Sequence, residues 1–419
     1  MIKRQSEYTR GLLKGLGPLN IQGLVHLGAT LAVVWSMAQV YGASGVGTLA
    51  MFQIIVGLGP LLASLGAPIA ITHLLRSSAI SSHDAWRISS VTSLTVVPVT
   101  CILLGVAIGT ASDAIFPSTD VPALFAALPA FAAATWFSLC MGMRLGRNDF
   151  VGYSTWMIVR SLGICCAAFA MPHAGANIGT TCWGIAGIHL VVALVASPWR
   201  DSRSASNMST KTSLRTLLMK TITFGWKAQA TTLANQVNYR ADTYLVNLMI
   251  SPVAAGFYLV CSQVADALTI AANSMATTTF TRVSAGDHGR RRTVHLTILG
   301  VATTFGLGVV AAPVVSALAP WFLGSEFTGM LPALAWLCIG VAWSAASRIL
   351  ANDIAGRGHP GHNLWSAGVA AALNIALNLL LIGHMGVVGA AIATASAMAI
   401  DTSLKLVIFL RLSASGRQS

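Results

Sequence analysis

One segment of this 419-residue sequence, 221–250, combines charged and amide side chains with the length of a membrane-crossing helix. At about 100° per residue, its polar residues fall into two neighbouring stripes and leave a third, apolar sector. The polar stripes are formed by Lys227, Thr231, Asn235, Asn238 and Asp242, and by Gln229, Thr232, Gln236, Arg240, Thr243 and Asn247. We expect the polar arc to face water and the apolar sector to face lipid or other helices.

Cations at membrane depth predict a binding site for an anion, because an ionisable group at the bilayer centre costs about 3 kcal/mol or more. Lys227 and Arg240, with Arg160 from the segment 150–170, can replace the hydration that a pyrophosphate loses. The amides of Asn235, Gln236 and Asn238 are hydrogen-bonding partners for a sugar. These six residues are therefore the candidate substrate-binding residues.

Two intramembrane carboxylates are candidates for coupling transport to a proton or sodium gradient. Asp266, and after it Asp242, is expected to exchange a proton or a cation, because desolvation disfavours an isolated carboxylate. A structural interpretation stays open, in which Arg240 pairs with Asp242, or Asp266 pairs with Arg160 or Arg240. Asp401 and Lys405, one turn apart, are expected to form a structural ion pair, and Asn374 and Asn378 to link helices.

The composition requires these segments to lie in a membrane, since 55% of the residues are apolar and only 9% are charged. A crossing takes roughly 20 apolar residues, which leaves short loops and no room for a folded soluble domain. The apolar runs predict twelve spans, at 17–40, 48–75, 87–108, 121–143, 150–170, 178–197, 221–249, 254–281, 294–317, 330–350, 363–382 and 388–411.

The basic residues predict the orientation of these spans. Lys and Arg, including Arg348 and Arg357, gather at both ends of the chain and in the loops after even-numbered spans, whereas the six opposite loops hold none. By the positive-inside rule, both termini are cytoplasmic. The net charge of +13 is therefore mainly a signal of topology, and no nucleic-acid partner is predicted.

Repeated motifs predict two lobes of six helices each. The sequence 144-RLGRND-149 opens the fifth span and 354-IAGRGHP-360 opens the eleventh, and glycine spacings near the second and sixth spans also recur in the eighth and twelfth. We expect an all-α integral membrane protein with lobes 1–207 and 208–419, joined by a basic linker at 200–220. Because six is even, the pseudo-two-fold axis lies along the membrane normal.

Several classes of protein lack support in the sequence. No phosphate-binding loop of the G-x-x-x-x-G-K-[ST] type is present, and the seven cysteines form no C-x-x-C pair that would indicate a metal site. The predicted outer loops are short, and their only acids are Asp113, Asp120 and Glu326. A membrane glycosyltransferase or polymerase is therefore disfavoured, and we expect a transporter without a cofactor.

The chain resembles the polysaccharide transporter family, which shares a superfamily with the multidrug and toxin extrusion (MATE) proteins. The likeness is carried by 40-VYGASGVGTLAMFQIIVGLGPLLASLGAP-68, 238-NYRADTYLVNLMISPVAAGFYLVCSQVADAL-268, and 348-RILANDIAGRGHPGHN-363 with 383-GHMGVVGAAIATA-395. Arg240, Asp242 and Asp266 match positions that are commonly charged in that family. Few basic residues occur in the first two spans, where some relatives have them.

This resemblance implies a MATE-like fold around a central cavity, and a flippase in the bacterial cytoplasmic (inner) membrane. Its substrate would be an undecaprenyl-pyrophosphate-linked oligosaccharide, moved outward for cell-surface or exopolysaccharide synthesis. Partners would include membrane lipids, a polysaccharide polymerase and chain-length proteins. The alternative within the same fold is a cation-coupled drug antiporter, which requires unpaired carboxylates and aromatic residues in the cavity in place of Lys227, Arg240 and Arg160.

Overall fold

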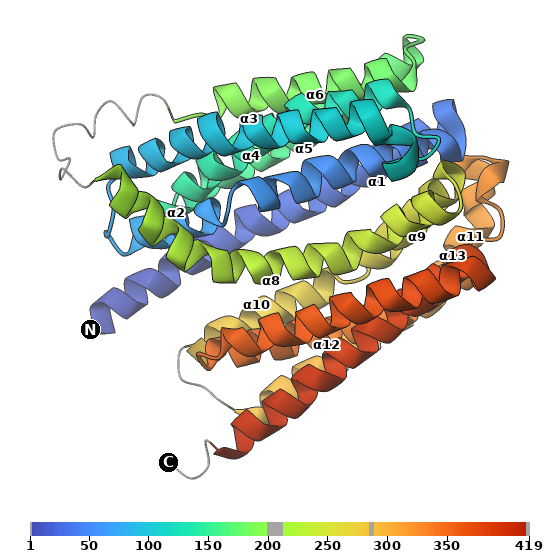
Figure 1. Cartoon of the computed structure of the whole chain (residues 1–419). Coiled ribbons are helices and arrows are strands. Elements are labelled where there is room, and N and C mark those ends of the chain that lie inside the picture. The colour runs from blue at the N-terminus through green and yellow to red at the C-terminus, as the bar shows by residue number, and fades with distance from the viewer. Residues whose placement is uncertain (1, 199–212, 285–288, 416–419) are drawn as a thin grey trace. The chain divides into compact units, whose positions relative to one another are not determined.

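A computed structural model describes residues 2–198, 213–284 and 289–415, and within these ranges the chain consists of helices joined by turns and short loops, with no strand (Figure 1). The predicted all-α class is confirmed. The helices are α1 (Ile2–Ala63), α2 (Ala67–Arg76), α3 (Ser82–Ile115), α4 (Val121–Gly146), α5 (Phe150–His173), α6 (Ile178–Val195), α8 (Leu214–Met249), α9 (Pro252–Ala267), α10 (Ile270–Ser284), α11 (Arg290–Leu323), α12 (Leu331–Gly356) and α13 (Pro360–Ser415), with a short 3-10 helix at Ser325–Phe327.

α13 contains two of the predicted spans, whereas α1 contains the span 17–40 and the first part of 48–75, whose remainder forms the turn 64–66 and α2. α1 is broken at Gly42 (φ 64°, ψ −167°), and α13 is broken at Gly386 (φ 57°, ψ −137°). Both residues have a positive φ, which residues other than glycine rarely adopt. The loops predicted at 41–47 and 383–387 are therefore abrupt breaks within otherwise continuous helices.

The number of membrane-crossing helices agrees with the prediction once these breaks are taken into account. In the described part of the chain, eight helices are long and apolar enough to cross a membrane, or nine if α9 and α10, which bend by 49°, form one span. α1 and α13 supply two crossings each. α8 is long enough to cross a membrane, but its polar arc makes it less apolar than the other spans. The helices account for all twelve predicted spans, and the chain is a multi-pass membrane protein.

The helices form two compact units. Unit 1 comprises Met1–Val40 and Met51–Thr232, and unit 2 comprises Tyr41–Ala50 and Leu233–Ser419. Unit 2 thus takes a ten-residue segment of α1, and unit 1 takes the first part of α8. The predicted boundary between residues 207 and 208 lies outside the described residues, so the division into lobes there stays a prediction.

In unit 1, α4 packs against α2, α3, α5 and α6, and its side chains are largely buried. Ile71 and Ile88 are fully buried in the apolar core here, next to Phe137. The first part of α8 is held to the end of α1 by a hydrogen bond from the Gln229 amide to the Leu61 carbonyl oxygen. His73 of α2 also stacks on Phe224 at 4.1 Å between ring centroids.

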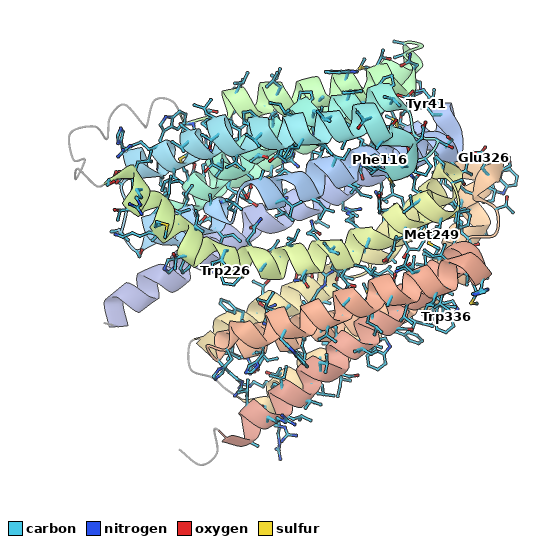
Figure 2. The ribbon with its side chains drawn as sticks, in the orientation of Figure 1. Tyr41, Phe116, Trp226, Met249, Glu326 and Trp336 are labelled. Carbon is cyan, nitrogen blue, oxygen red and sulfur yellow. The ribbon has the colours of Figure 1, made fainter. Side chains whose placement is uncertain are left out.

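In unit 2, α12 packs against α9, α10, α11 and α13. The α1 segment 41–50 meets the start of α9 so closely that Gly47 and Gly256 have no space for a side chain. At the Gly42 break, the carboxylate of Glu326 accepts a hydrogen bond of 2.6 Å from the Ala43 backbone N–H, next to Tyr41 (Figure 2). Glu326 thereby caps the segment that follows the break, where helix N–H groups lack partners.

Candidate functional site

A polar cavity of about 550 Å³ lies within unit 2, between α8, α9, α10, α12 and α13. It is lined by five of the residues that were predicted from sequence, namely Asn235, Gln236, Asn238, Arg240 and Asp266. The four on α8 fall on neighbouring turns of its polar arc. The helical periodicity of that arc explains why residues spread over six positions face one space.

The break between α9 and α10 positions Asp266. The Asp266 carbonyl oxygen accepts hydrogen bonds from the backbone N–H and the hydroxyl of Thr269, at 3.0 and 2.8 Å. Both side chains line the cavity, and Asp266 is exposed. Among the described residues, no Lys, Arg or His nitrogen lies within 4.0 Å of its carboxylate. Asp266 is therefore a carboxylate open to the cavity without a direct cationic partner.

Arg348 is a cavity residue that the sequence analysis had assigned to membrane topology. It lies on α12, and its guanidinium donates hydrogen bonds to Ser344 Oγ (3.2 Å), Asn273 Oδ1 (2.6 Å) and the Tyr239 hydroxyl (2.9 Å). The guanidinium carbon also lies 5.5 Å from the centre of the Tyr239 ring. Arg348 falls in the last turn of the predicted span 330–350, and that position was the available sign that it faces the membrane interior.

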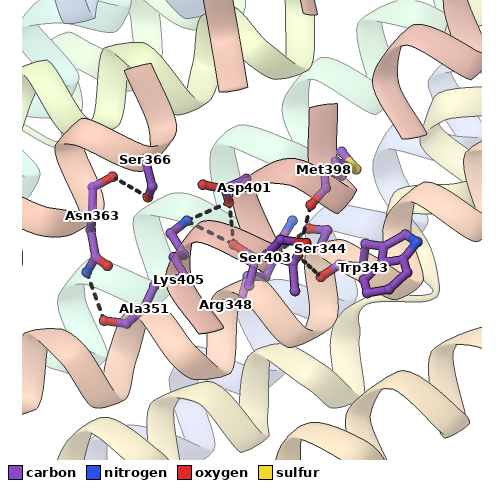
Figure 3. A network of polar contacts seen from close by, with 12 residues as sticks. Trp343, Ser344, Arg348, Ala351, Asn363, Ser366, Met398, Asp401, Ser403 and Lys405 are labelled. Carbon is purple, nitrogen blue, oxygen red and sulfur yellow. Dashed lines mark hydrogen bonds and ion pairs between the residues drawn. The ribbon is translucent and has the colours of Figure 1, made fainter. Parts of the chain in front are cut away.

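An ion pair between α13 residues also lines the cavity (Figure 3). Lys405 Nζ lies 2.6 Å from Asp401 Oδ2 and donates to Ser347 Oγ of α12 at 2.9 Å. Ser347 in turn donates to Asp401 Oδ2 at 2.5 Å. The predicted pair is formed, and its place in the cavity wall gives it access to a ligand.

Asp242 lies in a closed network beside the cavity, and its side chain is 2% exposed. Its carboxylate accepts hydrogen bonds from Asn374 (2.6 Å) and Asn378 (3.1 Å) of α13 and from Tyr258 of α9 (3.0 Å). Thr394 of α13 donates a further, short bond to it. All four donors are neutral, and no cationic nitrogen of the described residues lies within 4.0 Å. In the described chain Asp242 therefore does not pair with Arg240.

The remaining predicted residues lie elsewhere. Arg160 of α5 belongs to unit 1, where it lines a smaller cavity of about 240 Å³ with Tyr153 and Met157. Its guanidinium carbon lies 5.0 Å from the centre of the Phe137 ring, a cation–π contact. The Lys227 side chain lies outside the described part of the structure.

Comparison with proteins of known structure identifies the type of fold. No family model matches the sequence, and no curated protein is significantly similar to it. The structure is similar to an inward-facing MATE family multidrug transporter of the MOP superfamily, with 12% identity over 97% of this chain and 99% of the other and a TM-score of 0.74. It is also similar to the lipid II flippase MurJ in an inward closed conformation, with 14% identity over 96% and 90% of the two chains and a TM-score of 0.72.

A third similar structure is a MOP superfamily transporter from Pyrococcus furiosus, with 11% identity, coverage of 98% of this chain and 96% of the other, and a TM-score of 0.65. Because the identities are low while the coverage is nearly complete, the likeness lies in the backbone arrangement. The chain has the MATE-like fold that these transporters and the lipid II flippase share.

Proposed function

We propose that this chain is a flippase that moves an undecaprenyl-pyrophosphate-linked oligosaccharide outward across the bacterial cytoplasmic membrane. The observation that supports this most is the cavity of unit 2, which is lined by two arginines and several amide side chains. Within the described chain, neither Arg240 nor Arg348 has a carboxylate within 4.0 Å. An anionic substrate group would give these guanidinium groups a direct partner.

The amides around the arginines suit the sugar part of such a substrate. Asn235, Gln236, Asn238 and Asn352 all line the cavity. Each amide offers two N–H donors and a carbonyl acceptor, which match the mixed donor and acceptor character of sugar hydroxyls. We therefore place the head group of the glycolipid in this cavity. In the cell, a polysaccharide polymerase and chain-length proteins would use the transported unit to build a cell-surface polysaccharide or exopolysaccharide.

Two carboxylates support coupling to a proton or sodium gradient. Asp266 is open to the cavity and can exchange a proton or a cation with the water in it. Asp242 is enclosed by neutral donors, so a bound proton or cation would change its charge without breaking an ion pair. We propose Asp266 as the first coupling residue and Asp242 as the second.

A cation-coupled drug antiporter is the second candidate, and the likeness to MATE transporters favours it as much as it favours a flippase. Asp266 is the cavity residue that suits a cationic drug, whereas Arg240 and Arg348 repel one. The two candidates therefore differ in the charge of the substrate.

Reconstitution into liposomes separates the two candidates. A fluorescent undecaprenyl-pyrophosphate-linked oligosaccharide in the inner leaflet is protected from an impermeant quencher until it is flipped. We expect the protein to expose this lipid faster than protein-free vesicles do, and not to transport ethidium. Ethidium transport together with unchanged glycolipid exposure would overturn the proposal and establish the antiporter.

A further inference from the structure

We propose that Arg348 and Lys405 form an oxyanion-binding site in the cavity of unit 2, and that Asp401 competes with the oxyanion for Lys405. This inference rests on the proposed function, because it assigns the anionic part of the glycolipid to particular side chains. The oxyanion would be either the diphosphate of the carrier lipid or a carboxylate on an acidic sugar.

Arg348 is held in place and still has hydrogen-bond donors to spare. A guanidinium carries five N–H groups. Three of them bond to Ser344, Asn273 and Tyr239, all of which are neutral, so one N–H on each Nη atom remains. Because these three partners are neutral, none of them neutralises the charge of Arg348, and its fixed orientation means that it loses little freedom on binding a ligand.

Lys405 has one remaining donor as well. An ammonium carries three N–H groups, and those of Lys405 that are used go to Ser347 Oγ and Asp401 Oδ2. The Lys405 side chain is almost wholly buried, yet it faces the cavity together with Arg348 (Figure 3). An oxyanion there would meet the donors left on both cations.

Asp401 holds Lys405 with only part of its carboxylate. Oδ2 accepts from both Lys405 and Ser347, whereas Oδ1 is buried and has no hydrogen-bond partner among the described residues. A buried oxygen without a partner is unfavourable, so the pair is incompletely stabilised. An oxyanion that approaches Lys405 therefore competes with an ion pair that is held through Oδ2 alone.

The charges around the cavity favour an anion. The cavity is lined by three cationic side chains and two carboxylates, namely Arg240, Arg348 and Lys405, and Asp266 and Asp401. From α10 only the neutral Asn273 lines the wall, and Thr269, just before this helix, is neutral too. Among the described residues that line the cavity, three cations thus stand beside two carboxylates, and the excess charge is positive.

The test is the affinity of the full-length protein in detergent for inorganic pyrophosphate and for glucuronate, measured by calorimetry. We expect Arg348→Gln and Lys405→Gln each to weaken binding by about tenfold or more, since a charge-assisted hydrogen bond is lost. We expect Asp401→Asn to tighten binding by about threefold, because the competing charge is removed. Binding of pyrophosphate alone identifies the carrier diphosphate as the source, and binding of glucuronate alone identifies an acidic sugar.

The matched control is another ion pair with the same spacing. Asp353 of α12 and Arg357, directly after α12, pair four residues apart but do not line the cavity, so Arg357→Gln should leave the affinity unchanged. Should Asp401→Asn fail to fold, Ser347→Ala replaces it, because that change frees a further Lys405 N–H and should also tighten binding.

Three results would overturn the site: no binding of either probe, unchanged affinity in Arg348→Gln, or equal or weaker affinity in the folded Asp401 or Ser347 variant. A different result would contradict the proposed function alone. Pyrophosphate binding that follows these expectations, in a protein that does not flip the glycolipid, would contradict the flippase and leave the oxyanion site standing.

Discussion

Asn374 of α13 donates a hydrogen bond of 2.6 Å from its side-chain amide to Oδ1 of Asp242 on α8. The same amide also donates to the backbone carbonyl of Asn238, at 3.0 Å. A single side chain thus ties the buried carboxylate to the turn of α8 that faces the cavity. A change in the charge of Asp242 would therefore act on the turn of α8 that lines the cavity.

Asp242 is expected to stabilise the fold through its acceptor oxygens and to contribute to coupling through its charge. Asp242→Leu should lower the stability of the purified protein, because each buried donor that loses its acceptor costs about 1–3 kcal/mol. Asp242→Asn keeps one acceptor oxygen and should be milder. Thermal unfolding in detergent measures both, and an Asp242→Leu variant as stable as the native protein would show that the network contributes nothing.

Asp266→Asn should leave expression and substrate binding normal while making transport insensitive to an imposed ion gradient. The reason is that Asp266 has no cationic partner within 4.0 Å in the described chain, so neutralising it does not leave a paired cation without its carboxylate. Transport in proteoliposomes, with and without a gradient, is the measurement. Full gradient-driven transport in the variant would refute the coupling role, and low protein levels restored by also neutralising an arginine would favour an ion pair.

Gly47→Val should destabilise the protein by about 1–3 kcal/mol, as overpacking does. An added Cβ at Gly47 would collide with the backbone carbonyl of Pro252, which cannot move aside as a flexible side chain can. Gly57→Val is the matched control on the same helix, since nothing lies within 4 Å of its Cβ position. Equal unfolding temperatures of the two variants would contradict the close packing between α1 and α9.

The predicted topology places both termini in the cytoplasm. Cysteines introduced at Ser118 and Ser325, in loops that lack Lys and Arg, should react with an impermeant maleimide added to intact cells. A cysteine at Ser77, between α2 and α3, should react only after lysis. The unsubstituted protein gives the background from its native cysteines, and the reverse pattern of labelling would invert the topology.

Hydropathy was sufficient to predict most of the helices. The predicted span 121–143 corresponds to α4 (Val121–Gly146), and 178–197 corresponds to α6 (Ile178–Val195). The interruptions at Gly42 and Gly386 were predicted as loops, but their form as abrupt breaks within continuous helices could not be foreseen, because glycine is common in membrane helices. What fixes the first break is Glu326, far away in the sequence.

The site was predictable where it depended on one helix and not where it depended on several. The periodicity of α8 was enough to bring Asn235, Asn238 and Arg240 to one cavity. Arg348 was missed because a basic residue at the end of a span is an ordinary topology signal. Its role depends on Tyr239 and Asn273, which lie 109 and 75 positions away in the chain.

The most direct test of the account is the rate at which a labelled undecaprenyl-pyrophosphate-linked oligosaccharide crosses proteoliposome membranes that contain either the native protein or the Arg240→Gln, Arg348→Gln double variant. Arg357→Gln, outside the cavity, serves as the control. We predict rapid translocation by the native and control proteins and loss of translocation in a double variant that remains folded. Translocation by the double variant at the native rate would contradict the claim that this cavity carries an anionic glycolipid.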